Sequence, residues 1–286
     1  MNEKNTAFRR TKSGALKAAI YFSAAVVCIL AVTVAAVVLI KGLPHISISF
    51  LTEKPSLLKG TIGILPNILN TLYIIFFTMI IVIPLGIGAA IYLNEYAKNK
   101  KLTNLIGLAA ETLSGIPSII YGLVGMLIFV QFCGFGTSLV AGSLTLVIMT
   151  LPTIMRTAEE SLKAVPQSYR EGALALGSGK WRVLRTVVLP SAVDGIITGV
   201  ILSVGRITGE SAALFFTAGM ANEIYGLAQA ASSGNAGSTL TVSLYMYAKE
   251  RGEFDTAFAI AAILLLLTVL LNFGAKYVQK HFSNRT

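Results

Sequence analysis

Long apolar runs separated by short charged stretches dominate the chain. Six of these runs approach or exceed the roughly 20 residues that a helix needs to cross a bilayer. They cover residues 18–40, 68–93, 105–132, 138–155, 191–216 and 257–277. Glu111 and Pro117 interrupt the third run, so its polar first part is expected at the membrane interface. The pattern predicts an all-α polytopic membrane protein with six transmembrane helices.

Composition supports the membrane assignment. The chain of 286 residues is 55% hydrophobic and only 13% charged, whereas soluble domains carry about 25% charged residues. The first apolar run is too long for a signal-peptide core and no small-x-small cleavage site follows it, so we interpret it as an uncleaved anchor. Cys28 and Cys133 lie in separate apolar segments without metal-ligand spacing, which favours packed residues over ligands.

The positions of the basic residues argue against a nucleic-acid partner, although the net charge is +10. If the N-terminus lies inside, seventeen of the 23 Lys and Arg residues fall in inner segments and five in outer segments, and Arg206 lies within an apolar run. Cytoplasmic segments are enriched in Lys and Arg in this way. The asymmetry predicts that both termini are cytoplasmic, and it explains the net charge through membrane insertion.

Two connecting segments are long. The outer one, residues 217–256, contains clusters of Gly, Ser and Asn and a charged end. The inner one, residues 156–190, is rich in Ala, Leu and Glu, which favours helix, and Pro166 divides it. We therefore expect two short helices with a turn between them in the inner segment.

The inner segment contains a spaced motif with a chemical logic of its own. Glu171 can pair with a cation on a partner, and the small residues Ala173 and Gly177 would let another surface approach closely. Gly177 can also end a helix in the left-handed conformation. Leu189 and Pro190 mark the restart of the next helix, because proline is tolerated in a first turn.

The same residues carry a resemblance to a known family. Glu171, Gly172, Ala173, Gly177, Leu189 and Pro190 match the spacing E-A-A-x3-G-x9-I-x-L-P, with Gly172 at the second position and Val187 in place of Ile. This resembles the EAA loop of ABC importer permeases, in which the loop is a coupling helix that docks into a groove on the ATPase subunit. An ordinary amphipathic loop is the alternative interpretation.

A narrower resemblance extends over residues 66–277. The stretches "SGIPSIIYGLVG" at 114–125 and "GRITGESAALFFTAG" at 205–219 are similar to phosphate-importer permeases of the PstA type. The resemblance implies a type I ABC importer permease fold. It places an N-terminal part with the first span and an outer loop at 1–65, a transmembrane domain with the coupling loop 156–190 at 66–277, and a cytoplasmic tail at 278–286.

The resemblance also implies a function and partners. The chain would be the permease subunit of an ATP-driven importer of inorganic phosphate in a prokaryotic plasma membrane. Its partners would be a second homologous permease, an ATPase dimer, an extracytoplasmic phosphate-binding protein and the lipid bilayer. The stretch "LGSGKW" at 176–181 lacks the spacing and the Ser/Thr of a phosphate-binding loop, so ATP and Mg²⁺ are expected on the ATPase. No cofactor, metal site or catalytic set is expected in this chain.

Arg206 and Glu210 stand within an otherwise apolar run. Their spacing of four predicts that they share one face of the fifth helix, and an ionised side chain at mid-membrane costs about 3 kcal/mol. In one interpretation they line the substrate pathway: the planar guanidinium binds an oxyanion, and Glu210 orients it. In the other, the two charges only neutralise each other.

Two further questions stay open from the residues alone. The pairs Gly195–Gly199 and Gly205–Gly209 have the spacing of close helix contacts, either with a partner subunit or within the chain. Permeases for sulfate or molybdate, an ion-coupled secondary transporter and a structural membrane scaffold are the alternative functions.

Overall fold

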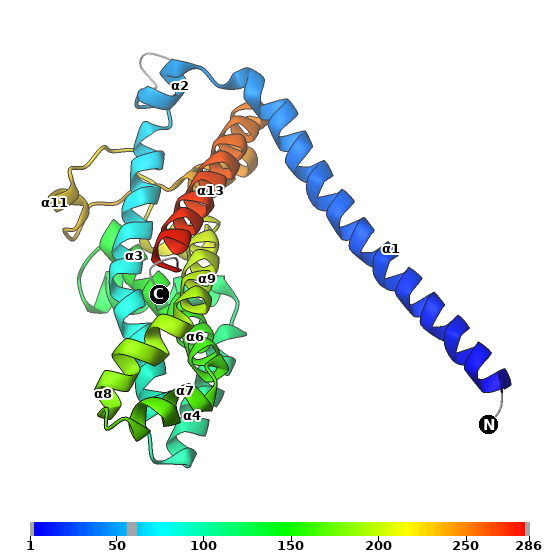
Figure 1. Cartoon of the computed structure of the whole chain (residues 1–286). Helices are drawn as coiled ribbons and strands as arrows, with labels where there is room; N and C mark the ends of the chain where they lie inside the picture. The colour runs from blue at the N-terminus through cyan, green and yellow to red at the C-terminus, as the bar shows by residue number, and fades with distance from the viewer. Residues whose placement is uncertain (1–2, 56–61, 284–286) are drawn as a thin grey trace.

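The computed structural model describes residues 3–55 and 62–283, and within these residues it contains helices and no strand. Figure 1 shows a bundle of helices from which the N-terminal helix diverges. Lys59 and Arg285, which contribute to the charge asymmetry, lie outside the described residues. The all-α architecture predicted from the sequence is confirmed.

The helical elements are numerous because several spans are divided. The first half of the chain forms α1 (Glu3–Gly42), η1 (Leu43–His45), α2 (Ile48–Thr52), α3 (Leu65–Ile91), η2 (Tyr92–Tyr96), α4 (Lys100–Ser114), α5 (Ser118–Gly125) and η3 (Met126–Phe132). The second half forms α6 (Leu139–Ala164), α7 (Gln167–Ala175), α8 (Lys180–Val183), η4 (Leu184–Val188), α9 (Leu189–Thr208), α10 (Ala212–Thr217), α11 (Leu227–Ala230), α12 (Leu240–Tyr245), η5 (Met246–Glu250) and α13 (Phe254–Ser283).

Five helical stretches of the described chain are long and apolar enough to cross a membrane. They are Leu16–His45, Leu65–Tyr96, Leu139–Ala164, Lys180–Thr208 and Phe254–Tyr277. A sixth span results if the pair Lys100–Ser114 and Ser118–Phe132 counts as one, and this pair is bent by 100°. The structure therefore has five or six spans.

The third apolar run is not one helix. α4 ends at Ser114, and the amides of Gly115 and Ile116 donate to the carbonyls of Thr112 and Leu113 in a tightened last turn. Pro117 follows, and a proline disfavours helical backbone at the residue before it. The chain bends at this point, and α5 begins in a new direction.

The fourth and fifth runs also end elsewhere than predicted. α6 continues past residue 155 to Ala164, so the inner loop begins later than residue 156. α9 ends at Thr208 instead of continuing to residue 216, and the separate short helix α10 begins at Ala212. Gly209, which has weak helix propensity, stands directly after the last helical residue. The prediction of one unbroken fifth helix was therefore wrong.

The outer segment 217–256 is more structured than its composition indicated. It contains α11, α12 and η5, and Leu240 and Val242 of α12 are fully buried. α12 contacts α13, α3 and α10. Part of this polar-looking segment therefore lies inside the bundle, because its small hydroxyl residues find partners there: Thr239 accepts from the amide of Val242 and caps α12.

α1 packs against the rest of the chain only toward its end. It contacts α13 and η1 among the described elements, and none of its most apolar window is buried. At the contact, a Cβ on Gly42 would lie 2.8 Å from Cβ of Ala262. Figure 1 shows the remainder of α1 (blue) directed away from the bundle.

Helices α3, α6 and α9 form the centre of the bundle, and small residues allow their close approach. Cβ atoms added at Gly195 and Gly199 of α9 would lie 2.8 Å from the Cβ atoms of Ser161 and Thr157 of α6. A Cβ added at Gly205 would meet no atom of another described element within 4 Å. The first glycine pair thus packs within the chain, whereas the second pair contacts no other helix among the described residues.

Candidate functional site

The motif segment folds as the short helix α7 and a sharp turn. Gly177 adopts φ +80°, and its amide donates to the carbonyl of Leu174 at 2.9 Å. The amide of Ser178 donates to the carbonyl of Ala173 at 3.2 Å. These two bonds make the Schellman motif, which ends a helix at a glycine in the left-handed region. The helix-ending role predicted for Gly177 is confirmed.

α7, the turn at Gly177 and α8 form a helical hairpin. Its open side carries the glycines of the motif. Glu171 is exposed, and nothing lies within 4 Å of a Cβ added at Gly172 or Gly177. Ala173 is half-buried against the apolar cluster that includes Val183. The small-residue face predicted from Ala173 and Gly177 is therefore provided by Gly172 and Gly177 instead, because Ala173 faces the bundle.

Leu189 and Pro190 lie within a continuous helical stretch. α8 passes through the π-helical turn η4 directly into α9, and the span covers Lys180–Thr208. A proline ring inside a helix would clash with the carbonyl four residues earlier, which is that of Thr186 within η4. The wide π-helical turn η4 lies where this clash would arise. The helix therefore begins at Lys180, and the restart predicted at Leu189 and Pro190 is wrong.

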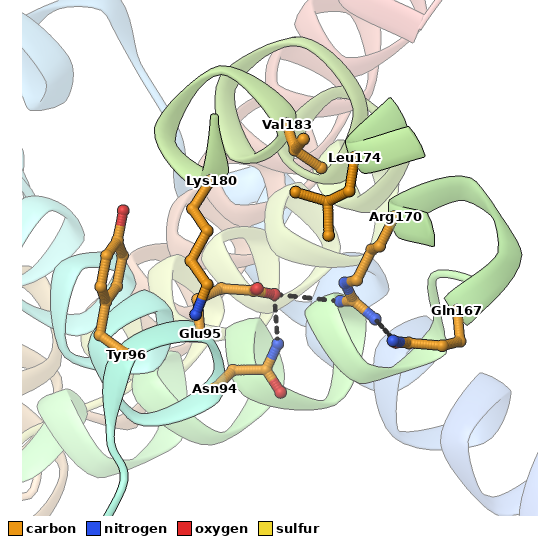
Figure 2. Close-up of a pocket in the computed structure, with 8 residues that line it drawn as sticks. All are labelled: Asn94, Glu95, Tyr96, Gln167, Arg170, Leu174, Lys180 and Val183. Atoms are coloured by element: carbon orange, nitrogen blue, oxygen red, sulfur yellow. Dashed lines mark hydrogen bonds and ion pairs between the residues drawn. The ribbon is translucent and has the colours of Figure 1, made fainter. Parts of the chain in front are cut away.

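An ion pair that the sequence analysis missed joins α7 to the end of α3. Nη2 of Arg170 lies 3.1 Å from Oε1 of Glu95 in η2. The same carboxylate oxygen accepts from Nδ2 of Asn94 at 2.8 Å. Figure 2 shows this pair in the wall of a cavity of about 340 Å³. The lining residues are Asn94, Glu95, Tyr96, Gln167, Arg170, Leu174, Lys180 and Val183.

Arg206 occupies the last turn of α9 and is half-buried. Its Nη1 lies 3.5 Å from Oγ1 of Thr153 on α6, a long hydrogen bond. A guanidinium offers five N–H donors in a planar fork. The weak bond to Thr153 therefore leaves most of this fork available to an anion.

Glu210 lies beyond the helix that carries Arg206. Its side chain is buried, with the residue 9% exposed, and Oε1 accepts from the amide of Ala213 in α10 at 3.1 Å. The backbone carbonyl of Glu210 accepts from Oγ1 of Thr241 at 2.7 Å. α9 ends at Thr208, so Glu210 lies outside the helix that carries Arg206, and the predicted shared helix face is wrong. The structure describes both charged residues, and no ion pair joins them.

Two broken helices meet near these charges. α5 follows the break at Pro117, and α10 follows the break after Thr208. The two short helices pack closely, because a Cβ on Gly122 would lie 2.8 Å from Cα of Ala213. In membrane proteins, irregular backbone at membrane depth is tolerated where it is covered by protein or lines a cavity, and discontinuous helices often form transport sites.

A polar network fixes the outer segment against the start of α3. Nδ2 of Asn67 donates to Oδ1 of Asn222 at 2.9 Å and to the carbonyl of Ser238 at 3.2 Å. The hydroxyl of Tyr225 donates to the carbonyl of Ala236 at 2.9 Å, and burial raises the pKa of Tyr225 above its usual value of 10.0. These bonds hold the segment before α12 in one position.

The helix breaks indicate a class of protein. Apolar spans that are broken near a half-buried arginine are typical of membrane transport proteins. The described residues contain no group of three or more His, Cys, Asp or Glu placed to hold a metal ion.

The chain belongs to the family of binding-protein-dependent transport system inner membrane components, whose family model matches residues 82–286. It is 41% identical over 197 residues to the probable ABC transporter permease YqgI of Bacillus subtilis, covering 69% of this chain and 67% of that protein. It is 32% identical over 242 residues to the phosphate transport system permease PstA of Pasteurella multocida, covering 82% and 83%.

A solved structure supports the fold. The inward-facing MetNI methionine ABC transporter matches with a TM-score of 0.59 at 20% identity, covering 77% of this chain and 94% of that chain. The fold is that of the type I ABC importer permeases, and the protein is a multi-pass membrane component of a transport system.

Proposed function

We propose that the chain is the permease subunit of an ATP-driven importer of inorganic phosphate. The observation that carries the proposal is the hairpin of α7, where the motif glycines Gly172 and Gly177 are open to a partner. The family membership and the similarity to PstA permeases agree with this function. The relatives named PstA favour phosphate over sulfate or molybdate.

The proposed partners follow from this role. A separate ATPase dimer binds ATP and Mg²⁺ and docks on α7, with Glu171 pairing with a cation on it. A second homologous permease completes the pathway, and an extracytoplasmic phosphate-binding protein delivers the anion. The end of the bundle that carries α7 faces the cytoplasm, as do both termini, because basic residues gather in those segments.

Arg206 is the proposed contact for the oxyanion. Its planar fork can donate two parallel hydrogen bonds to phosphate. The long bond to Thr153 is weak enough for an anion to displace it. Transport also requires that the anion leaves again, so a partly engaged arginine is better suited than a free one. Glu210 acts beside it by holding the start of α10 through the amide of Ala213.

Uptake in proteoliposomes tests the proposal. The chain is reconstituted with its partner subunits, and labelled phosphate uptake is measured with and without ATP, and with excess sulfate or molybdate. We expect uptake that requires ATP and resists both competitors. Uptake driven by an ion gradient without ATP would support a secondary transporter, and strong competition would support another oxyanion.

A substitution locates the anion contact in the same assay. Arg206→Lys keeps the charge and loses the two-pronged donor, so uptake is expected to fall by about tenfold or more, the effect of losing one good charge-assisted bond. Arg185→Lys is the control, because Arg185 is an exposed residue of the same helical stretch. Equal uptake by both variants would contradict the role of Arg206.

A further inference from the structure

Three helical elements meet at the side chain of Arg170, and one of them, η2, is distant in the sequence: Glu95 and Arg170 are 75 residues apart. Arg170 of α7 donates from Nη2 to Oε1 of Glu95 at 3.1 Å and to the carbonyl of Leu162 at 2.7 Å. From Nη1 it donates to the carbonyl of Val165 at 3.2 Å and lies 3.5 Å from Oε1 of Gln167. The guanidinium thus joins α7 to the end of α6 and to the end of the span formed by α3 and η2.

This contact is built in a way that favours arginine. The side chains of Arg170 and Glu95 are 15% and 22% exposed, so the pair is mostly withdrawn from water. The carbonyls of Leu162 and Val165 lie at the C-terminal end of α6, where the helix dipole attracts cations. A lysine ammonium is a compact point charge without the fixed fork of a guanidinium. It is therefore not expected to reach both the carboxylate and the two carbonyls.

α7 also follows directly on α6 in the chain, and its contact with η4 and α8 is apolar and adaptable. Ala173 packs against the buried cluster that contains Val183 and Leu184. Such a contact is non-directional, since the hydrophobic effect follows buried area. Among the described residues, the directional side-chain bonds between α7 and the spans are those of Arg170.

We infer that Arg170, paired with Glu95, is a positioning residue that passes a displacement of α7 to the spanning helices α3 and α6. The inference rests on the proposed function, in which a partner ATPase moves α7. α6 is the relevant recipient, because the same helix carries Thr153, the partner of Arg206. A movement that begins at α7 would thereby reach the residue proposed to hold the anion.

The first test measures coupling in the reconstituted complex. Phosphate imported per ATP hydrolysed is compared for wild type, Arg170→Lys, Glu95→Gln and the double variant. We expect each single variant to lower this ratio by about threefold or more. The double variant should have a ratio no lower than that of the more impaired single variant, because the effects of substitutions at contacting residues are not additive. Glu159→Gln is the control: Glu159 pairs with Lys163 within α6 and forms no ion pair with another element in the described part of the chain.

A second measurement reads the position of α7 without transport. Spin labels are placed at Lys98→Cys, beyond η2, and Ala175→Cys, at the end of α7, after Cys28 and Cys133 are replaced by serine. Lys98 and Ala175 are both exposed. We expect a narrow distance distribution in the parent and a broadened or shifted one in Arg170→Lys and Glu95→Gln, with no change in Glu159→Gln.

The outcomes separate the inference from the function on which it rests. An unchanged import ratio overturns the inference, and so does a lowered ratio with an unchanged distance distribution, since Arg170 would then act by touching the ATPase directly. If the wild-type complex imports no phosphate, the proposed function fails. The distance measurement still shows in that case whether Arg170 positions α7, and an unchanged distribution refutes it.

Discussion

Substituting single glycines of α9 distinguishes a packed face from an open one. In Gly199→Ala the new Cβ would lie 2.8 Å from Cβ of Thr157, well inside the 3.4 Å at which ordinary contact begins. Overpacking of this kind costs about 1–3 kcal/mol. In Gly205→Ala the new Cβ meets nothing within 4 Å. Both variants gain about 1 kcal/mol of helix propensity. This gain cancels when they are compared, so the difference isolates the packing cost.

The assay is thermal unfolding of the purified chain in detergent. Since 1 kcal/mol shifts the Tm of a chain of this size by about 2–4 °C, Gly199→Ala is expected to unfold at least about 2 °C below Gly205→Ala. Adding Thr157→Gly to Gly199→Ala moves the small residue from α9 to α6. The double variant should therefore recover part of the lost Tm. Equal Tm values for the two single variants would refute the close packing of α6 on α9.

Three further predictions use other parts of the chain. Cysteines introduced at Gly179 and Asn235 should be labelled from the cytoplasmic and outer sides respectively, and labelling of Asn235 from the cytoplasm would overturn the orientation. Gly177→Leu should impair coupling without loss of membrane insertion, because φ +80° costs a residue with a side chain about 1–2 kcal/mol; unchanged transport per ATP would contradict this. Glu210→Gln should keep the thermal stability of the wild type, since an amide oxygen can still accept from Ala213, whereas Glu210→Ala should lose about 1–3 kcal/mol, the cost of leaving a buried amide donor unsatisfied; equal stability of the two would refute the role of this bond.

Features with a local cause could be predicted from the sequence. The apolar runs indicate the spans because each is nearly long enough by itself to cross the bilayer. Gly177 was predicted as a helix end because the left-handed conformation is a property of a single residue. The motif spacing likewise placed α7 correctly on the loop between two spans.

Features that depend on distant partners could not be predicted. Glu95 and Arg170 are 75 residues apart, and neither belongs to a periodic pattern that would pair them. α12 is buried although its surroundings are rich in Ser, Thr and Gly, because hydroxyls that bond within the fold remove the penalty of burial. The fifth run reads as one helix because a single glycine within an apolar run is tolerated by many helices.

The break after Thr208 explains how the chain holds two charges among apolar residues without pairing them. Arg206 lies in the last turn of α9, where the unpaired carbonyls carry partial negative charge. Glu210 lies just before α10, where its carboxylate accepts the free amide of Ala213. Each charge therefore stands at a helix end of opposite sign, an arrangement that one continuous helix could not offer. Glu210 is engaged in this way, and the guanidinium of Arg206 contacts Thr153 instead. The same break thus lowers the free-energy cost of burying the charges and leaves most of the Arg206 fork without a hydrogen-bond partner among the described residues, as the proposed contact with an anion requires.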